Sequence, residues 1–591
     1  MASPGQAVEP KYAAVYVESV SIRNFRGISA CRVEFEPGVT LLVGRNNVGK
    51  SRLLQALQLA LGGRVADVDD FTVGSVAEPE VDVVLAPVAP PTPNSDQAFE
   101  DDLAQMLDSD VQTISESPFR ERFAWRTRVK RSAEGLGARS EFKVLTFNAS
   151  ASEWVERSTA KDLSRRQRSV VACDLVNTGR DLMEELSRRG SGVRRVLSDL
   201  GVDDATRGDL ESRLSDLGQA IVDGSATLAS VSRALEALNR TVGSVGSPGI
   251  SPLPITLEEL SRSLSIELDA GRGSLPIRMH GAGARSLASL QVQGVLYERL
   301  LGADGGSLRP HPVTLVEEPE AHLHPQAASE LPHLLEGIRG QVIASTHSSQ
   351  VVTSSRPRSI RLLRTDEAAV TVIDLGPGED GAAGLPRPFR PDLHTQEMEK
   401  LKRLAERPFG EMLFASAIVI GDGATERGFL PPILRHALGP KAHGVCVIDP
   451  ESLASQTARA AVKFSDLVGL PWFIFADSDE DGVAAVGTLH GSGVSAAPVV
   501  WVGKPDASSP VGVSGAFEAM MTDFDMEVGR AACEQVRPDL APVIDVPASM
   551  KKLKGCLGPT LADVMIERYP DPSNWPAPLQ ELVRLIDGVG P

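Results

Sequence analysis

Residues 39–51 read VTLLVGRNNVGKS, and no other stretch of the chain constrains the fold as tightly. The apolar run Val39–Val43 predicts a β-strand, and leucines at helical spacing predict a helix over Ser51–Leu61. Between them, residues 44–51 match the phosphate-binding pattern G-x-x-x-x-G-K-S. A strand, a glycine-rich loop and a helix in this order predict an α/β core that binds a nucleotide.

Each residue type in this phosphate loop (residues 44–51) has a role in the chemistry that the pattern predicts. Glycine lets the backbone curl so that its N–H groups face phosphate oxygens, Lys50 reaches the β- and γ-phosphates, and Ser51 coordinates Mg²⁺. The sequence therefore predicts ATP and Mg²⁺ as cofactors. The expected nucleotide-binding residues of the loop are Gly44, Asn46, Asn47, Gly49, Lys50 and Ser51.

A second apolar strand, predicted over Val313–Val316, ends in two carboxylates. We expect Glu317 to hold the magnesium shell and Glu318 to orient and deprotonate the attacking water. A third buried strand is predicted over Gln341–Ala344, and the segment after it brings His347 towards the γ-phosphate. Together these residues predict ATP hydrolysis.

The composition is that of a folded protein of several domains. The chain has 591 residues, with 60 Lys and Arg against 78 Asp and Glu and a formal net charge of −18. This balance excludes a protein that coats nucleic acid by bulk positive charge, but not a nuclease with a local basic track. Its five cysteines lie far apart, and no apolar stretch reaches the ~18–20 residues of a membrane helix. We expect a cytoplasmic protein without disulfides or a membrane contact.

The pattern changes along the chain and predicts an inserted helical arm and a separate C-terminal unit. The arm is predicted to mediate dimerisation, although packing of its helices on their own domain is an equal alternative. A linker rich in Gly, Pro and acidic residues precedes the last unit. The predicted limits are 1–177 and 269–375 for the two parts of the ATPase head, 178–268 for the arm, 376–407 for the linker and 408–591 for the C-terminal domain.

The strand predicted over Glu121–Arg131 alternates apolar and basic residues. Its basic face carries Arg122, Arg126, Arg128 and Lys130. A period of two places these side chains on one side of an antiparallel sheet. Two interpretations remain open, a solvated sheet face and a track that contacts phosphates.

Acidic residues follow two predicted strands of the C-terminal unit. Asp422 and Glu426 follow a strand over 417–420, and Asp477 and Asp479 follow a strand over 472–476. Because parallel strands end at the same edge of a sheet, the four carboxylates are expected to meet there. Like charges this close repel each other, and divalent metal ions with oxygen ligands commonly offset that repulsion. The sequence therefore predicts a metal site at this edge.

The N-terminal motifs resemble the ABC-type ATPase heads of the RecF and SMC group. The segments that carry the resemblance are SIRNFRGI (21–28), GRNNVGKS (44–51), VTLVEEPEAHLHP (313–325) and ASTHS (344–348). In that group two heads enclose ATP, and a glycine-rich signature helix of one head caps the γ-phosphate bound by the other. The resemblance implies this role for Gly281 and Gly283, and it implies a homodimer or higher homo-oligomer.

The segment PFGEMLFASAIVIGDGATERGFLPPIL (408–434) resembles the TOPRIM unit of OLD-family (overcoming lysogenization defect) ATP-dependent endonucleases. The expected fold is therefore an α/β chain, with an ABC-type P-loop ATPase that carries an antiparallel β subdomain and a helical arm, followed by a parallel-sheet TOPRIM domain. Asp422 stands where that family usually has Glu. Because Asp is one methylene shorter, an alternative prediction is that metal-dependent cleavage at this site is weakened or lost. The resemblance implies Asp422, Glu426, Asp477, Asp479 and Glu518 as metal ligands and Lys554 as the residue that neutralises the scissile phosphate.

The sequence thus predicts an ATP-hydrolysing, metal-dependent DNA endonuclease that uses Mg²⁺ or Mn²⁺ in a two-metal mechanism. The family resemblance suggests phage defence or DNA repair, with a UvrD-like helicase or another defence protein as a further partner. The alternative is a RecF-like DNA-binding ATPase clamp with an inert TOPRIM domain. A TOPRIM topoisomerase or primase is a weaker alternative, because the four tyrosines lie in predicted strands or helices near other motifs or the terminus.

Overall fold

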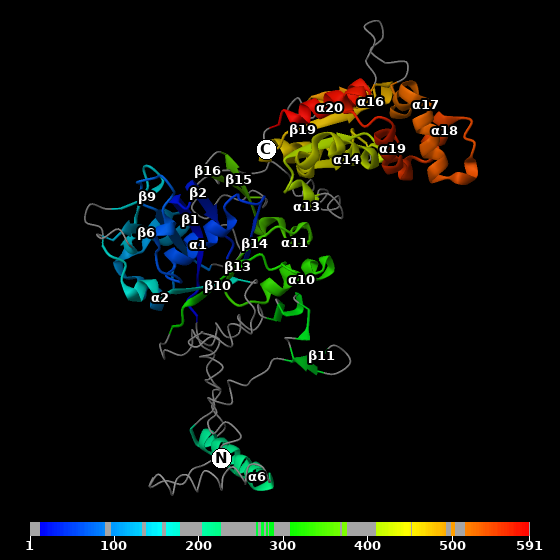
Figure 1. Cartoon of the computed structure of the whole chain (residues 1–591). Helices are drawn as coiled ribbons and strands as arrows, with labels where there is room; N and C mark the ends of the chain where they lie inside the picture. The colour runs from blue at the N-terminus through cyan, green and yellow to red at the C-terminus, as the bar shows by residue number, and fades with distance from the viewer. Residues whose placement is uncertain are drawn as a thin grey trace. The chain divides into compact units, whose positions relative to one another are not determined.

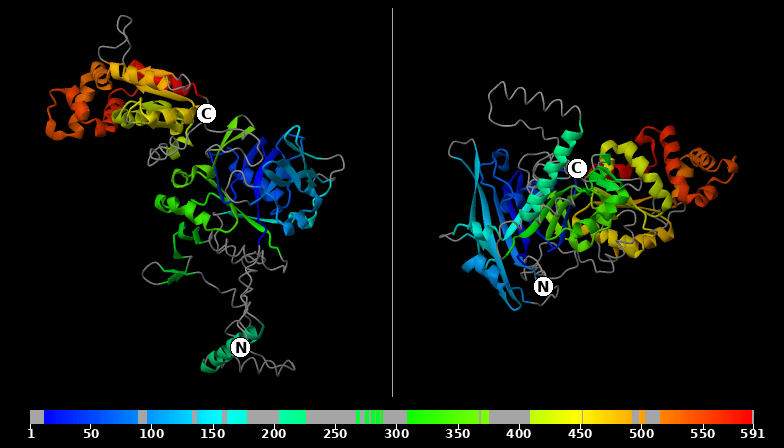
Figure 2. Two further views of the ribbon diagram at one scale, coloured as in Figure 1. Left: turned by 180° about the vertical axis from the view of Figure 1, so that it is seen from behind. Right: turned by 90° about the horizontal axis from the view of Figure 1, so that it is seen from below.

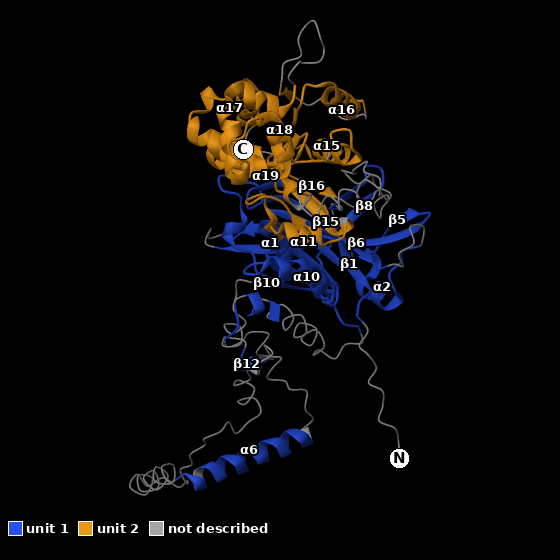
Figure 3. Cartoon of the chain, turned by 90° about the vertical axis from the view of Figure 1, so that its right-hand side faces the viewer, with its two compact units in different colours: residues 1–29, 34–40, 51–345 blue, residues 30–33, 41–50, 346–591 orange. Residues whose placement is uncertain are grey.

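A computed structural model gives the fold of the chain, which divides into two compact units (Figures 1 and 3). The first unit contains residues 1–29, 34–40 and 51–345, and the second contains residues 30–33, 41–50 and 346–591. The structure describes residues 12–88, 96–132, 137–156, 161–177, 204–225, 267–269, 274–276, 279–281, 283–285, 287–288, 308–366, 369–374, 409–450, 452–491, 498–502 and 515–589.

The first unit contains an antiparallel sheet, as the sequence predicts. Strand β4 pairs with β1 on one side and β6 on the other, and β6 also pairs with β5 and β7. Trp125 of β6 lies buried, and its indole N–H donates to the carbonyl of Ala60 at the end of helix α1, 3.1 Å away. The strands are β1 (Val15–Phe25), β4 (Glu80–Pro87), β5 (Gln112–Glu116), β6 (Phe119–Arg131) and β7 (Ala138–Val144), and α1 is Lys50–Ala60.

The basic residues of β6 form ion pairs with carboxylates of the first unit. Arg122 is fully buried and donates two hydrogen bonds of 2.8 Å to Glu18. Arg126 likewise pairs with Asp82 of β4 at 2.7 Å. The other pairs are Arg128 with Glu80 and Glu156, and Lys130 with Glu141. The alternation correctly placed these side chains together. Arg122 and Arg126 are largely buried and Arg128 and Lys130 are partly exposed, and because all four are paired they do not form a track of uncompensated charge.

Further strands of the first unit lie parallel to each other. Strand β13 (His311–Glu317) pairs with β10 (Val171–Asn177) and with β14 (Gln341–Thr346). Helix α10 (Pro325–Glu336) connects β13 to β14. The register places Glu317 opposite Ser345, so the carboxylate-bearing end of β13 lies at the end of β14.

In the second unit, β3 (Val39–Val43) pairs in parallel with β15 (Ile360–Asp366). Strand β15 pairs in the antiparallel sense with β16 (Ala369–Asp374). The bounds of β3 match the predicted strand, because a mostly apolar segment between Gly38 and Gly44 leaves little freedom in where the strand ends.

The C-terminal part of the second unit is a four-stranded parallel sheet in the order β18-β17-β19-β20. Helices gather around these strands (Figures 1 and 2), and Phe429 packs edge-on against Phe517 at 5.1 Å in the shared core. The parallel sheet was predicted, and its assignment as TOPRIM stays a prediction. The elements are β17 (Ala417–Gly421), β18 (Val445–Ile448), β19 (Trp472–Ala476), β20 (Val499–Trp501), α14 (Ala424–Leu438), α15 (Gln456–Val468), α16 (Glu480–His490), α17 (Phe517–Val536), α18 (Val546–Lys552), α19 (Lys554–Arg568) and α20 (Ala577–Asp587).

Parts of the predicted organisation lie outside the described residues. These are the linker 376–407 and most of the arm 178–268, of which α6 (Asp204–Gly224) is described. The predicted domain limits therefore stay predictions. Among the described helices, none combines the length and apolarity needed to span a bilayer. The remaining elements are β2 (Ile28–Glu34), β8 (Thr146–Asn148), β9 (Glu153–Val155), β11 (Glu267–Asp269), β12 (Ser274–Pro276), α2 (Asp101–Leu107), α3 (Arg165–Arg168), α11 (Ser349–Thr353) and α13 (Phe409–Met412).

The buried pair between Arg122 and Glu18 gives a stability prediction. Replacing Arg122 by Ala leaves the Glu18 carboxylate partly buried without its main partner, which costs about 3–5 kcal/mol of unfolding free energy. Arg139→Ala is the control, because the Arg139 side chain is 70% exposed and its loss should cost about 0.5 kcal/mol or less. Urea denaturation followed by tryptophan fluorescence measures both changes. Equal losses in the two variants would contradict the expected role of burial.

Candidate functional site

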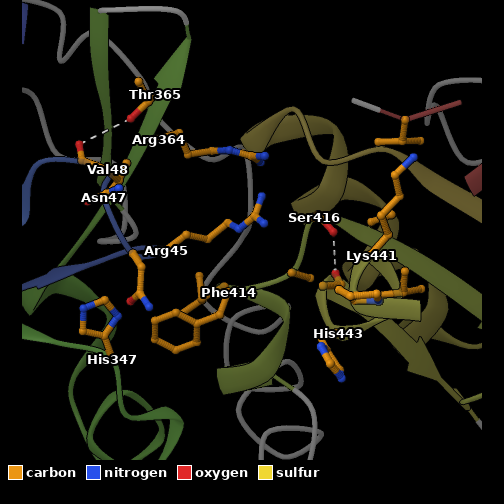
Figure 4. Close-up of a pocket in the computed structure, with 18 of the residues that line it drawn as sticks. Arg45, Asn47, Val48, His347, Arg364, Thr365, Phe414, Ser416, Lys441 and His443 are labelled. Atoms are coloured by element: carbon orange, nitrogen blue, oxygen red, sulfur yellow. Dashed lines mark hydrogen bonds between the residues drawn. The ribbon is translucent and has the colours of Figure 1, made fainter. Parts of the chain in front are cut away.

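The backbone conformation of the phosphate loop requires glycine, and strand β15 contacts the loop on two sides. Gly44 and Gly49 have φ values of +155° and +108°, which side chains rarely adopt. A Cβ atom at Gly44 would also lie 2.6 Å from the carbonyl oxygen of Leu363. On the other side of the loop, the carbonyl of Val48 accepts a hydrogen bond of 3.4 Å from the Thr365 hydroxyl (Figure 4). Strand β15 therefore supports the loop at both ends.

The loop directs its lysine inward. Lys50 is 5% exposed, and its ammonium group donates to the carbonyls of Gly44 at 2.7 Å and Arg45 at 3.0 Å. The Nδ1 atom of His347 lies 3.3 Å from the same ammonium group. The structure thus brings together two residues that the sequence assigned separately to the γ-phosphate. Asn46 and Asn47 are exposed on the loop, Gly49 is buried, and Ser51 is half-buried.

Two hydrogen bonds to Ser345 hold Glu318 in an unusual backbone conformation. Its φ is +46°, in the left-handed region that costs a residue with a side chain about 1–2 kcal/mol. The Glu318 N–H donates to the carbonyl oxygen of Ser345 at 3.1 Å and to its hydroxyl at 3.3 Å. Glu317 lies opposite Ser345 in the sheet, and Ser345 precedes His347 by two positions. Both acids therefore lie beside Ser345 near the end of β14.

The two glycines expected to form a signature motif have different surroundings. A Cβ atom at Gly283 would lie 2.8 Å from the His322 carbonyl, so this position requires glycine for close backbone approach. No atom lies within 4 Å of a Cβ built at Gly281, which is exposed. The N–H of Arg285 donates to the carbonyl of Gly281 at 3.2 Å, as in a helical turn. Ala282 and Ser286 of this motif lie outside the described residues.

The C-terminal sheet brings the predicted acidic residues to one edge. Strands β17 and β19 are neighbours, with Gly421 opposite Phe475, so the turns that carry Asp422 and Asp477 leave the sheet at the same level. Glu426 lies in the first turn of α14 and Glu518 in the first turn of α17. Both of these glutamates are buried, at 6% and 2% exposure.

Burial and mutual repulsion raise the pKa values of three of these acids. Burial is the main cause at Asp477, and the charges of Asp422 and Asp479 add to it, raising the pKa to about 7. Burial raises the pKa of Glu426 to about 7, with added repulsion from Asp477 and Glu518. The pKa of Asp422 rises to about 6 through burial and the charge of Asp479. The acids therefore lie within electrostatic reach of one another, in surroundings with too little positive charge to stabilise all of them as anions.

One lysine and one further aspartate complete the acidic edge. The ammonium group of Lys554 lies 3.3 Å from the Glu518 carboxylate. Burial alone would lower the pKa of Lys554, but the charge of Glu518 raises it. Asp449 follows strand β18 and raises the pKa of Asp422 by its charge. Our sequence reasoning missed Asp449, although its place directly after an apolar segment was the available signal.

Backbone hydrogen bonds fix two of the carboxylates. Asp477 accepts from the N–H of Phe517 at 2.9 Å, and Asp479 accepts from the N–H of Gly482 at 2.8 Å and caps helix α16. Within the part of the chain that the structure describes, no three His, Cys, Asp or Glu side chains are placed as ligands of one metal ion. The donor chemistry nevertheless suits Mg²⁺ or Mn²⁺, which prefer carboxylate oxygens.

Two family profiles match the chain. The profile described as "AAA ATPase domain" matches residues 16–73, and the one described as "AAA domain, putative AbiEii toxin, Type IV TA system" matches residues 294–353. The first segment contains the phosphate loop, and the second contains Glu317, Glu318 and His347. These two segments therefore match ATPase domains of the AAA type, a class that uses ATP, typically with Mg²⁺.

Several known proteins are similar to parts of the chain. YbjD of Escherichia coli (strain K12), an uncharacterized protein, is 27% identical over 200 residues, which are 33% of this chain and 33% of YbjD. The "DNA double-strand break repair Rad50 ATPase" of Archaeoglobus fulgidus is 39% identical over 49 residues, 8% of this chain and 6% of Rad50. The crystal structure of an Smc head bound to the C-winged helix domain of ScpA is 17% identical, with a TM-score of 0.35, over 60% of this chain and 97% of the other. The chain thus spans a third or less of the curated relatives it matches.

The raised pKa of Asp477 predicts how stability depends on pH without metal. The unfolded carboxyl has a pKa of about 3.9, and the folded one about 7, so stability from this group falls as pH rises from about 4 to 7. Asp477→Asn keeps an oxygen for the Phe517 N–H and removes the charge. We expect a higher Tm than wild type at pH 8, by about 2–4 °C per kcal/mol of repulsion removed, and little change at pH 4.

Thermal unfolding in EDTA at both pH values measures this difference. Asp563→Asn is the matched control, because Asp563 is exposed on α19. A lower Tm for Asp477→Asn at pH 8 would contradict the proposed repulsion within the acidic edge.

Proposed function

We propose that the protein binds and hydrolyses ATP at the phosphate loop and cleaves DNA at the acidic edge of its C-terminal sheet. The observation that carries the first activity is the 3.3 Å approach of His347 to Lys50, within segments that match ATPase profiles. The second activity rests on the five carboxylates gathered near Lys554.

At the nucleotide site, the chain's own groups supply binding and proton transfer. The ammonium group of Lys50 exchanges its loop carbonyls for phosphate oxygens, and the N–H groups of Asn46, Asn47 and Gly49 face the same anion. Glu317 and Ser51 are the proposed holders of Mg²⁺. Glu318 takes the proton of the attacking water, with its backbone held by Ser345, and His347 contacts the γ-phosphate.

A glutamine at position 318 tests the assignment of the base. Glu318→Gln keeps the size of the side chain but cannot accept the proton, so ATP binding should persist while turnover falls about 10²–10⁴-fold. Steady-state phosphate release and equilibrium binding of a fluorescent ATP analogue measure the two effects. Glu330→Gln on the exposed face of α10 is the control. Unchanged turnover in Glu318→Gln would place the base elsewhere.

For strand cleavage, Asp422, Glu426, Asp477, Asp479 and Glu518 are the proposed holders of divalent cations. Such cations, when bound, activate water and stabilise the leaving 3′ oxygen. Lys554 is the proposed donor to a non-bridging oxygen of the scissile phosphate. The charges of Glu518, Glu426 and Asp477 raise its pKa, so its ammonium group stays charged beside the proposed cleavage site. Support for this site comes from the pKa values of about 6 to 7 for three of its acids, which indicate a cluster that gains from added positive charge.

A plasmid-nicking assay with Mg²⁺ or Mn²⁺ tests the nuclease. Asp477→Ala should reduce nicking by at least about 10²-fold, because a metal ligand is lost, while ATP turnover stays near the wild-type rate. Asp563→Ala, also in the C-terminal part, should nick as wild type does. Wild-type nicking by Asp477→Ala would refute the assignment.

Two observations favour a second candidate, a DNA-binding ATPase clamp with an inert C-terminal site. Within the described residues, no three acids are placed around one metal position, and Asp422 replaces the longer Glu usual in the resembled family. In either case we propose DNA as the partner and a homodimer or higher homo-oligomer formed through the ATPase heads and the arm. A wild-type protein that hydrolyses ATP and binds DNA without nicking it would favour the clamp.

A further inference from the structure

The second unit contains a cavity of about 940 Å³ whose charged walls are all basic (Figure 4). Arg45 and Asn47 of the phosphate loop, Arg364 of β15 and the segments around Phe414 and Lys441 line it. His347 and His443 also reach its wall, and no Asp or Glu is among the described lining residues. In a chain with a formal net charge of −18, such a wall marks a local positive potential.

Two arginines dominate this wall. The guanidinium groups of Arg45 and Arg364 extend into the same space from the loop and from the strand (Figure 4). Burial lowers the pKa of Arg364, and the charge of Arg45 lowers it further, so the two cations repel each other. Arg364 donates to the carbonyl of Val468 at 2.5 Å, which fixes its direction. No described carboxylate lies within ion-pair distance of either guanidinium group.

The third cation of the cavity is partly neutralised. Lys441 pairs with Asp587 at 2.6 Å, and its side chain is 59% exposed. The uncompensated charge therefore belongs to Arg45 and Arg364. Paired guanidinium groups match the oxygens of phosphate in bidentate geometry. The half-buried ring of Phe414 adds an aromatic surface, which nucleotide bases stack on.

The geometry points to a second anion site, in which Arg45 and Arg364 hold a phosphate group of a ligand other than the nucleotide on Lys50. The phosphate belongs either to a nucleic-acid strand or to a free polyphosphate, since both present the same oxygens. The volume admits more than one phosphate and a base. This inference goes beyond the proposed function, because it requires neither ATP hydrolysis nor strand cleavage.

Two probes distinguish the sources, both in the absence of ATP. Fluorescence anisotropy measures binding of a fluorescein-labelled oligothymidylate of about twelve nucleotides, within the usual range for one binding site. Calorimetry measures binding of inorganic tripolyphosphate. Arg364→Gln and Arg45→Gln should each weaken at least one probe about tenfold, since each removes charge-assisted hydrogen bonds. For the oligonucleotide, the slope of log K against log salt should also fall by about 1.

Arg435→Gln is the matched control, because Arg435 is an exposed arginine of α14 and does not line the cavity. It should stay within about twofold of wild type for both probes, as expected of a surface charge outside the site. An effect on the oligonucleotide identifies a strand as the ligand, and an effect on tripolyphosphate alone identifies a free polyphosphate. Thermal unfolding of each variant verifies that it folds.

Three results would overturn the inference. In the first, both arginine variants bind both probes as wild type does. In the second, Arg435→Gln weakens binding as much as Arg364→Gln, which would indicate bulk charge. In the third, Lys50→Ala and Arg45→Gln weaken binding but Arg364→Gln weakens neither probe, which would assign the anion to the phosphate loop alone.

Discussion

The parallel pairing of β17 with β19 is the constraint on which the C-terminal half depends. Because Gly421 lies opposite Phe475, the two turns that follow must project their acids from one edge. Both strands are fully buried and apolar, so a shift of register would expose or misplace an entire hydrophobic surface. The hydrophobic core therefore supplies the free energy that keeps mutually repelling carboxylates together.

The two proposed sites use opposite electrostatic arrangements. At the acidic edge, anions are buried together with Lys554 as the nearby cation, so proton binding or cation binding relieves the repulsion. At the phosphate loop, a cation is buried instead, and the ammonium group of Lys50 donates to the carbonyl oxygens of Gly44 and Arg45. The antiparallel sheet shows a third arrangement. There Arg122, Arg126 and Arg128 form ion pairs with carboxylates, and these pairs link neighbouring strands of the sheet.

Local patterns predicted the parts of the fold that depend on local sequence. The strands at 39–43 and 472–476 have the predicted bounds, because short, mostly apolar segments that end next to Gly44 and Asp477 leave little ambiguity. The alternation along β6 also located its basic residues on one side. It could not show that Glu18 and Asp82 would neutralise them, since pairing between distant strands is not encoded in a local period.

The sequence did not reveal Asp449 or the approach of Arg45 to Arg364, because both depend on contacts between segments that are distant in the chain. Asp449 follows a strand of only four residues, which periodicity detects poorly. Arg45 and Arg364 approach each other only because β3 and β15 pair, although they are far apart in the sequence. Motif reasoning placed Lys50 and His347 near the same phosphate, since each motif has a defined chemical role. Contacts without such a motif require the folded structure.

Asp479 has two functions that a single substitution does not separate. Its carboxylate caps helix α16 and also contributes negative charge to the acidic edge. An alanine at this position removes a cap worth about 1 kcal/mol together with the charge. Asparagine preserves the cap and removes only the charge, so it reports on electrostatics alone. At position 479, an alanine substitution is therefore less informative than an asparagine substitution.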